Sequence, residues 1–382
     1  MQIQTSSSMN PFIISGYHSP DYFCDREKET KKIVTALEND RNITLISPRR
    51  MGKTGLIHHV FHQININNKT TKCFYLDIFA TQNLRDFTLL LAKTVLGKLD
   101  NSTEAMMKQM ATFLKSCRPV FSYTPTTQQL QITFDIQPQN TEASLQEIFE
   151  YLKHSKTRCY IAIDEFQQII EYPEKGVEAL LRSYIQFLPN VKFIFAGSKK
   201  HLMDTIFSSA NRPFYQSTQK IGLQAISIET YRKFANHFFN KAKCEIEDCV
   251  FDDIYNKMLG HTWYIQIILN QLYTLKKSKI FLDDVETIIA EILMEENATY
   301  KTYCELISKG QLKLLIAIAK EKKVTAPYEN GFMQKYQLSA PSSVRQALNA
   351  LIDKNLILSN EQNEFFVYDR FFSLWLEQKG NI

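Results

Sequence analysis

The sequence predicts an α/β protein in which helices cover both faces of a parallel sheet, followed by two regions built mostly from helices. Two observations support this fold class. Short runs of continuous apolar residues alternate with helical patterns over residues 1–226, and after residue 226 the strand signal nearly vanishes. With 382 residues, of which 44% are hydrophobic and 22% are charged, the chain is long enough for two or three globular domains.

Helices and strands are expected to alternate along the first region. An amphipathic pattern with Ile33, Val34 and Leu37 on one side predicts the first helix. Strands are expected at four apolar runs, residues 43–46, 73–78, 159–163 and 191–198. Helices are expected over residues 25–39, 84–99, 103–115, 143–154 and 176–188. Two more are expected, one that follows the turn after residue 46 and ends near residue 64, and one that begins at residue 199. Residues 118–141, rich in Pro, Thr and Gln, are interpreted as a protruding loop or hairpin.

The remainder of the chain is predicted to form a helical lid and then a winged helix-turn-helix. Lid helices are expected over residues 229–241, 252–259, 264–275 and 283–295. From residue 304 the pattern predicts three helices, two short strands (356–358 and 364–368) and a last helix (370–377), an order typical of a winged helix. The predicted domains are residues 1–226, 227–296 and 297–382.

The turn between the first strand and the next helix has the residues of a phosphate-binding loop. The segment SPRRMGKT meets the pattern G-x-x-x-x-G-K-[ST] at every defined position except the first, where Ser47 replaces glycine. In such a loop backbone amides face the phosphates, Lys53 contacts the β and γ oxygens, and the Thr54 hydroxyl is a ligand of Mg²⁺. This predicts a P-loop NTPase fold that binds ATP and Mg²⁺ through Ser47, Pro48, Arg49, Arg50, Met51, Gly52, Lys53, Thr54 and Gly55.

Two features of this loop leave alternatives open. Ser47 would need a backbone angle that glycine adopts more easily, so either the turn has another shape there or the serine hydroxyl offsets the strain. Arg49 and Arg50 either contact phosphate or face solvent, as charged residues in turns usually do.

A pair of carboxylates follows a later buried strand. The run CYIAI ends in Asp164 and Glu165, where Asp164 would hold Mg²⁺ and Glu165 would orient and deprotonate the attacking water. The alternative is an acidic pair at a helix N-terminus, favoured by the helix dipole. Because the pair lies downstream of the phosphate-binding loop with one strand between them, the functional interpretation is preferred.

Two further residues are candidates for contacts with the γ-phosphate. Ser198 ends the following strand, where it would contact the γ-phosphate or the attacking water, or cap the helix that starts at Lys199. Arg212 is the best candidate for a cation that stabilises charge as the bond breaks; the alternative is a solvated loop arginine before Pro213.

At these motifs the chain resembles the archaeal-type ATPase family, a branch of P-loop proteins near the AAA-type and signal-transducing ATPases that also occurs in bacteria such as the Bacteroides group. The resemblance implies an ATPase core, a helical lid and a C-terminal winged helix. It places Lys53, Thr54, Asp164 and Glu165 at the nucleotide and magnesium positions, and Ser198 on the sensor strand. The matching segments are YFCDREKE (22–29), SPRRMGKT (47–54), AIDEFQQI (162–169), FAGSKKHLM (195–203), LGHTWYIQ (259–266) and DRFFSLWL (369–376).

The chain departs from the family pattern at Ser47 and at Tyr215-Gln216-Ser217, where members often have tyrosine, glycine and arginine. If that arginine assists hydrolysis, Arg212 must replace it or turnover will be slow. Near the adenine, Tyr22 and Phe23 would stack on the base or pack against the first helix. Trp263 would lie near the base or in the core of the lid.

Charge and composition limit the choice of partners. The net charge of +5 and pI near 8.6 fall short of a dedicated nucleic-acid-binding domain. Residues 297–382 carry eleven Lys or Arg against eight Asp or Glu, the predicted recognition helix offers only Arg345 as a strong base reader, and the wing is acidic. DNA binding is therefore possible but not favoured over contact with an unknown protein partner.

The amino-terminal segment lacks the features of a secretory signal, and no apolar run is long enough to span a membrane. Seven cysteines without metal-ligand spacing indicate a reducing compartment, so a cytoplasmic location without membrane contact is expected. The sequence predicts a Mg²⁺-dependent ATPase, monomeric or oligomeric, in which weak or partner-stimulated hydrolysis is coupled to movement of the lid and winged helix. The alternative is a nucleotide-gated switch or DNA-binding regulator with little turnover.

Overall fold

The computed structural model describes residues 9–96, 99, 112, 114–124, 129–155, 157–360 and 363–379. The chain divides into two compact units, one formed by residues 13–231 and the other by residues 1–12 together with 232–382. The helix predicted over residues 103–115 lies almost wholly outside the described residues.

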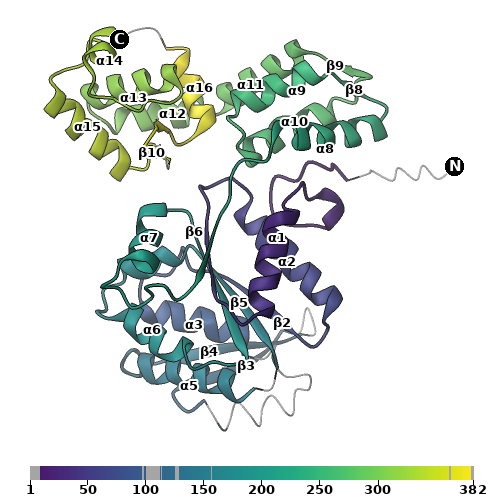
Figure 1. Cartoon of the computed structure of the whole chain (residues 1–382), viewed down its shortest axis with the longest axis vertical. Coiled ribbons are helices and arrows are strands. Elements are labelled where there is room, and N and C mark those ends of the chain that lie inside the picture. The colour runs from purple at the N-terminus through teal and green to yellow at the C-terminus, as the bar shows by residue number, and fades with distance from the viewer. Residues whose placement is uncertain are drawn as a thin grey trace. The chain divides into compact units, whose positions relative to one another are not determined.

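A five-stranded parallel sheet forms the centre of the 13–231 unit (Figure 1). Its order is β2-β5-β6-β1-β7, so strands distant in the sequence are neighbours. Four of the strands are the predicted apolar runs, because parallel strands covered on both faces bury side chains on each side. The strands are β1 (Ile43–Ile46), β2 (Lys72–Asp77), β5 (Cys159–Asp164), β6 (Val191–Gly197) and β7 (Gln219–Gly222).

Strand β7 was not predicted, because its four residues bury only one side chain, that of Ile221. Its backbone pairs in parallel with β1, from Ile43 opposite Gln219 to Ile46 opposite Gly222. This edge strand is therefore defined by main-chain pairing rather than by an apolar pattern.

Helices cover both faces of this sheet. Ile33 and Leu37 of α1 pack with Leu56 and Val60 of α2 in a core on one face. A larger core on the other face is formed with side chains of α3, α5, α6 and α7. The predicted α/β class is confirmed. The helices are α1 (Glu27–Glu38), α2 (Lys53–Asn67), α3 (Leu84–Val95), α5 (Thr141–His154), α6 (Val177–Ile185) and α7 (Lys200–Ser208).

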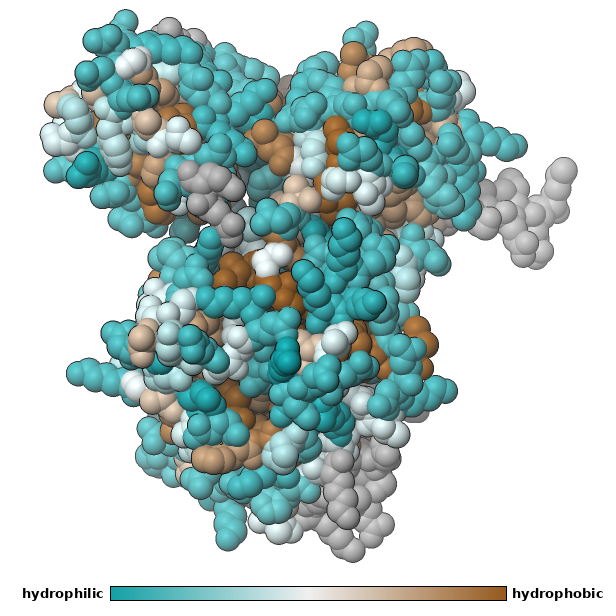
Figure 2. Space-filling model, in the orientation of Figure 1, coloured by the Kyte–Doolittle hydropathy of each residue, from teal (hydrophilic) through white to brown (hydrophobic). Residues whose placement is uncertain are grey.

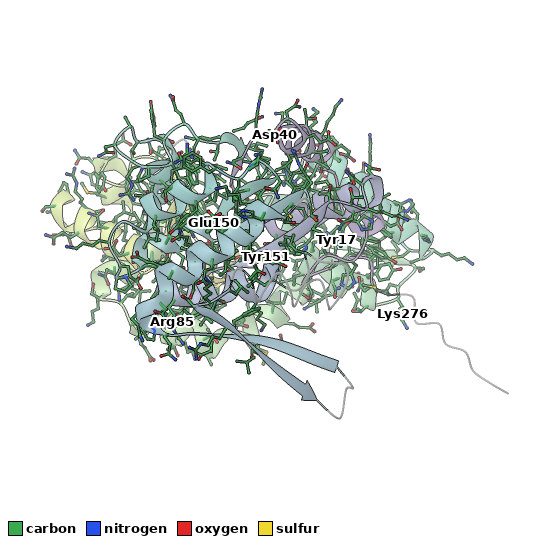
Figure 3. All side chains as sticks on the ribbon, turned by 90° about the horizontal axis from the view of Figure 1, so that it is seen from below. Tyr17, Asp40, Arg85, Glu150, Tyr151 and Lys276 are labelled. Atoms are coloured by element: carbon green, nitrogen blue, oxygen red, sulfur yellow. The ribbon has the colours of Figure 1, made fainter. Side chains whose placement is uncertain are left out.

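Within the segment interpreted as a loop or hairpin, the structure shows a hairpin. Strand β3 (Cys117–Thr124) pairs antiparallel with β4 (Gln129–Ile136), and the ribbon extends away from the helices behind it in Figure 3. Its base is anchored, because Cys117 and Ile136 are fully buried and Arg85 Nε donates to the Ile136 carbonyl oxygen at 2.8 Å.

The second unit is mainly helical, as predicted. Phe12 is fully buried there against aromatic rings of α8 and α10, including Phe239 at 5.3 Å between centroids. A parallel pair of short strands, β8 (Glu245–Ile246) and β9 (Lys279–Ile280), lies among the first helices. These helices are α8 (Ile228–Lys241), α9 (Asp248–Lys257), α10 (Thr262–Thr274) and α11 (Leu282–Glu295).

The last part of this unit has the element order predicted for a winged helix. Strands β10 (Ile357–Ser359) and β11 (Phe365–Val367) pair antiparallel after the helices and before α16. The helices are α12 (Asn297–Glu305), α13 (Lys309–Glu321), α14 (Asn330–Lys335), α15 (Pro341–Asp353) and α16 (Arg370–Glu377).

On the face seen in Figure 2, the surface of the 13–231 unit is mostly hydrophilic, and apolar side chains form small separate areas. Across the described ranges, none of the helices combines the length and the apolar character that crossing a bilayer requires. All seven cysteines have free thiols.

Candidate nucleotide-binding site

The loop predicted to bind phosphate joins β1 to α2. Ser47 is fully buried, its amide donates to the Gly197 carbonyl oxygen at 3.2 Å, and its hydroxyl donates to the Pro48 carbonyl oxygen at 2.9 Å. Positive φ angles occur at Arg50 (66°) and Gly52 (88°), and not at Ser47. Of the two alternatives for Ser47, the structure therefore agrees with a turn of another shape, because the left-handed conformation occurs at Arg50 and Gly52.

Helix α2 begins at Lys53, so its first backbone amides and the positive end of its dipole lie at the end of this loop. Arg49 and Arg50 are partly buried, and the Arg49 guanidinium lies over the exposed ring of Phe79, 5.4 Å from its centroid. Arg49 is thus held against the end of β2 rather than extended into solvent.

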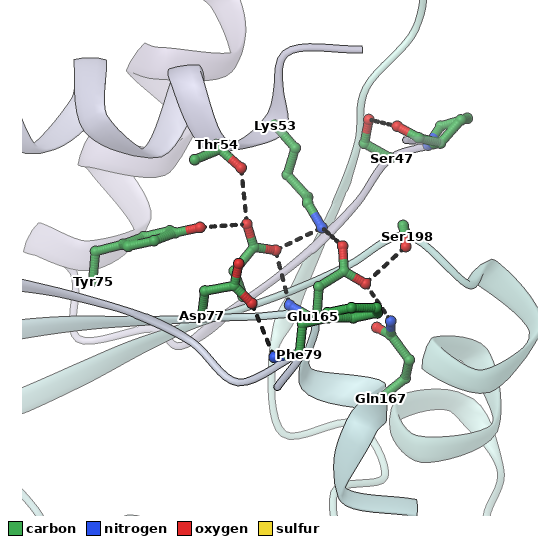
Figure 4. Close-up of polar contacts among 11 residues, drawn as sticks. Ser47, Lys53, Thr54, Tyr75, Asp77, Phe79, Glu165, Gln167 and Ser198 are labelled. Atoms are coloured by element: carbon green, nitrogen blue, oxygen red, sulfur yellow. Dashed lines mark hydrogen bonds and ion pairs between the residues drawn. The ribbon is translucent and has the colours of Figure 1, made fainter. Parts of the chain in front are cut away.

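Two carboxylates share the ammonium group of Lys53 (Figure 4). Lys53 Nζ lies 2.6 Å from Asp164 Oδ1 and 3.1 Å from Glu165 Oε1. The Thr54 hydroxyl donates to Asp164 Oδ2 at 2.9 Å. The structure therefore brings together the lysine, the threonine and both acids that the sequence singled out, although 110 positions separate Thr54 from Asp164.

Asp164 is held on all sides by donors. The Tyr75 hydroxyl of β2 donates to Oδ2 and the Glu165 amide donates to Oδ1, each at 2.9 Å. Burial by itself would raise the pKa of Asp164. The charge of Lys53 and the hydrogen bonds from Lys53, Tyr75 and the amide outweigh burial, so the pKa lies below its ordinary value. The acid is therefore ionised at neutral pH.

Glu165 has a left-handed backbone conformation, with φ of 54°. Its Oε2 accepts hydrogen bonds from the Ser198 hydroxyl at 2.8 Å and from the Gln167 amide, while Oε1 faces Lys53. Burial favours a higher pKa for Glu165, but the charge of Lys53 and the hydrogen bonds from Ser198 and Gln167 lower it overall. These contacts differ from those of an acidic pair that interacts with a helix N-terminus.

The Ser198 hydroxyl points to Glu165 and does not cap the next helix. Helix α7 begins at Lys200, and its N-cap residue Lys199 makes no side-chain capping bond. Arg212 behaves differently, because its guanidinium forms an ion pair with Glu178 of α6. No contact described for Arg212 reaches Lys53 or the two acids.

The sequence analysis missed three side chains of this cluster. Tyr75 and Asp77 lie on β2, which pairs in parallel with β5 so that Asp77 is directly opposite Asp164. Burial, with the nearby charges of Asp164 and Glu165, raises the pKa of Asp77, although the amide of Phe79 opposes the change. The sequence predicted that both residues lie in the strand that ends near residue 78. It did not show that this strand lies beside the one that ends at Asp164, because the order of strands in the sheet is not visible in the sequence. The third, Gln167, gave no signal beyond its closeness to Glu165.

Two of the residues expected near an adenine base, Phe23 and Trp263, make packing contacts. Phe23 stacks on His59 of α2, with 4.4 Å between centroids and 17° between the planes, and meets Tyr17 edge-on at 5.8 Å. It therefore packs on α2, against a core that also contains side chains of α1. Trp263 is partly buried and meets Tyr264 edge-on at 5.2 Å.

The donor set at Thr54 and Asp164 suits Mg²⁺, which prefers oxygen ligands and takes one or two from the protein while keeping several waters. Both donors are oxygen atoms, and the Thr54 hydroxyl already lies within hydrogen-bond distance of Asp164 Oδ2. In the described part of the chain, no group of three or more His, Cys, Asp or Glu side chains is arranged to hold a metal by itself.

Comparison with known families gives two matches. Residues 23–268 match the model of an ATPase domain found predominantly in Archaea. Residues 298–378 match the model of a probable winged helix domain. None of the curated proteins matches the chain.

Three solved structures share the fold over nearly the whole chain. The Walker-type ATPase of Pyrococcus abyssi is 16% identical, with 96% of this chain and 99% of that chain covered and a TM-score of 0.66. The Aeropyrum pernix ORC2 protein, solved in ADPNP and ADP complexes, is 14% identical, with 97% of each chain covered and a TM-score of 0.59. The Aeropyrum pernix ORC1 protein, solved in complex with DNA, is 10% identical, with 97% and 96% covered and a TM-score of 0.53. At these identities the likeness establishes the fold.

Proposed function

We propose, from the premise that this chain belongs to the family of ATPase domains found predominantly in Archaea, that it binds ATP with Mg²⁺ and hydrolyses it at the carboxyl edge of its parallel sheet. The observation that carries the proposal is the convergence of Lys53, Thr54, Asp164, Glu165 and Ser198, which are joined by a continuous series of ion pairs and hydrogen bonds. They come from α2 and from the ends of β5 and β6, the edge where open α/β sheets bind ligands.

Each residue has a proposed role. The backbone amides of the loop after Pro48 surround the phosphates, and Lys53 exchanges its carboxylate partners for the β and γ oxygens. Thr54 and Asp164 hold Mg²⁺, which when bound neutralises charge on those oxygens. Glu165 then orients the attacking water and accepts its proton, while Ser198 fixes the carboxylate.

Arg212 is the proposed cation that stabilises charge at the γ-phosphate. It reaches the phosphates only if its ion pair with Glu178 opens, so Glu178 competes with ATP for this side chain. Replacing Glu178 with glutamine should therefore increase phosphate release, and the same replacement in an Arg212→Ala background should have no effect.

We further propose three functional parts, a P-loop core (1–226), a helical lid (227–296) and a winged helix (297–382), in which nucleotide turnover moves the lid and the winged helix. The partner would be a protein that stimulates hydrolysis. An arginine supplied by a second copy of the chain would make the active form an oligomer, so phosphate release per chain should then rise with protein concentration.

The decisive experiment compares wild type with Glu165→Gln. Loss of a positioned general base should lower the rate of phosphate release by roughly 10²-fold to 10⁴-fold. Binding of a non-hydrolysable ATP analogue should remain, so that the variant retains ATP. The matched control is Glu171→Gln. Glu171 is an exposed glutamate at the end of the 3-10 helix (Phe166–Glu171) that follows Glu165. Equal phosphate release by wild type and Glu165→Gln would refute the assignment of the base.

A second candidate, a nucleotide-gated DNA-binding regulator, is supported by the winged helix and by the fold shared with the ORC1 protein solved on DNA. The polar residues of α15, among them Arg345 and Gln346, are exposed, and the Arg345 guanidinium lies over the Tyr328 ring. Duplex DNA should then be retained by the full-length protein at low salt and lost at high salt. Absence of binding at low salt would reject this candidate.

A further inference from the structure

The carboxylate of Glu165 is fixed through one oxygen. Oε2 accepts hydrogen bonds from both the Ser198 hydroxyl and the Gln167 amide, whereas Oε1 contacts only Lys53 among the described contacts. Because the carboxylate is planar, holding Oε2 also sets the direction of Oε1. When Lys53 turns to a phosphate, Oε1 becomes the oxygen that can accept a proton from water.

The Gln167 side chain buries an unpaired polar atom, which is unfavourable for folding. It is 4% exposed, and its Oε1 has no hydrogen-bond donor among the described residues. An apolar side chain of similar size would fill this site without burying an unpaired polar atom. The bond to Glu165 is thus the polar contact that gives a glutamine a physical reason to occupy the site.

Gly197, the last residue of β6, leaves room for this amide. A Cβ atom built on Gly197 would overlap with Gln167 Oε1 and with the side chain of Met203. Gly197 has no positive φ angle, so the close approach of side chains explains the glycine here and backbone conformation does not. The end of β6 therefore supplies both the Ser198 donor and the space that Gln167 occupies.

We propose that Gln167 is a positioning residue for the reaction: its amide holds Oε2 of Glu165 so that Oε1 faces the attacking water, and Gly197 provides the space for this arrangement. The inference rests on the proposed hydrolysis. It adds a requirement that neither the phosphate-binding loop nor the acidic pair contains, namely a second donor beside Ser198.

The test uses the full chain with Gln167→Met, which keeps the size of the side chain and removes the donor, and Gln167→Ala, which removes the amide without adding bulk. For both variants, kcat for phosphate release should fall about tenfold to a hundredfold. This is smaller than the roughly 10²-fold to 10⁴-fold loss expected when the general base itself is removed. The Kd for a non-hydrolysable ATP analogue should stay within about twofold, because the contacts described for Gln167 are with Glu165 and the end of β6 and not with the phosphate-binding loop. Gly197→Ala should lower kcat in the same way by displacing the amide.

Two readouts separate positioning from a general structural effect. The first is a fall in kcat without a change in the Kd for the ATP analogue, which a loss of folded protein would not produce. In a Glu165→Gln background, Gln167→Met should cause no further loss. The matched control is Gln168→Met, since the neighbouring Gln168 donates to the Thr81 carbonyl oxygen instead.

The possible results have distinct meanings. Equal kcat for wild type, Gln167→Met and Gln167→Ala would overturn the role of Gln167, and so would an equal fall in the Glu165→Gln background. If the wild-type protein released no phosphate, the proposed hydrolysis would be wrong. The positioning role of Gln167, which rests on hydrolysis, would then be wrong as well.

Discussion

Lys53 and Arg370 are both buried basic side chains, one in each compact unit, but their surroundings differ. The Lys53 side chain is 7% exposed and is shared by two carboxylates from the end of β5. The Arg370 side chain is 4% exposed and pairs with Glu377 and Ser373 of its own helix, α16, and with the Lys257 carbonyl oxygen. One cation therefore faces an excess of negative charge, whereas the other faces a single carboxylate.

The comparison shows that burial of a charge does not by itself identify a binding site. Arg370 joins α16 to the end of α9, so its contacts hold two helices together. Lys53 has partners from another element, and those partners are themselves held by Tyr75, Ser198 and Gln167. A surplus of ionisable groups that converge from several elements distinguishes the candidate site.

The largest effect is expected from Lys53→Ala. Affinity for a non-hydrolysable ATP analogue should fall by about thirtyfold or more, because removing one member of a buried charged contact costs roughly 2–5 kcal/mol. Titration of the purified variant with the analogue measures this loss. The control is Lys175→Ala, since Lys175 is an exposed lysine of the same unit. Unchanged affinity in Lys53→Ala would show that Lys53, like Arg370, has no role in nucleotide binding.

Arg370→Ala should affect stability and not nucleotide binding. Its removal leaves Glu377 without its cation, so the free energy of unfolding should fall by about 3 kcal/mol, as measured by urea denaturation. The exposed Arg345, replaced in the same way, should cost less than about 1 kcal/mol. A nucleotide affinity reduced as strongly as in Lys53→Ala would contradict a structural role for Arg370.

Acid should weaken the fold through the Lys53 cluster. The pKa values of Asp164 and Glu165 lie below their ordinary values of 3.8 and 4.5 in the folded state, so both groups contribute stability above those values. That contribution should disappear as the pH falls through the lowered pKa values. In the absence of nucleotide, Lys53→Met should show a smaller loss of unfolding free energy on acidification than wild type, whereas Arg370→Ala should retain the wild-type loss. Parallel curves for wild type and Lys53→Met would disprove this coupling.

The smallest effect is expected from Tyr75→Phe, which removes one donor from Asp164. The Mg²⁺ concentration for half-maximal phosphate release should rise about fivefold, corresponding to the roughly 1 kcal/mol of a single hydrogen bond. Tyr184→Phe is the control, because that ring stacks on Phe149 and makes no described contact with the acids. An unchanged Mg²⁺ requirement would show that Tyr75 contributes to packing only.

The α/β class, four of the five strands, the loop predicted to bind phosphate and the position of the acidic pair at a strand end could be predicted from the sequence. Each of these depends on a short stretch of sequence: a continuous apolar run, the composition of a turn or two adjacent residues. The sequence also predicted the element order of the winged helix. It did not reveal β7, because that strand buries one side chain and depends on backbone pairing with β1.

Which side chains contact one another depended on the tertiary structure. Tyr75 reaches Asp164 because β2 lies beside β5 in parallel register, and the Ser198 hydroxyl reaches Glu165 because β6 lies on the other side of β5. It also directed Arg212 to Glu178 and placed the positive φ at Arg50 instead of Ser47. Strand order and register join residues about 30 to 110 positions apart, so no local window of sequence contains that information.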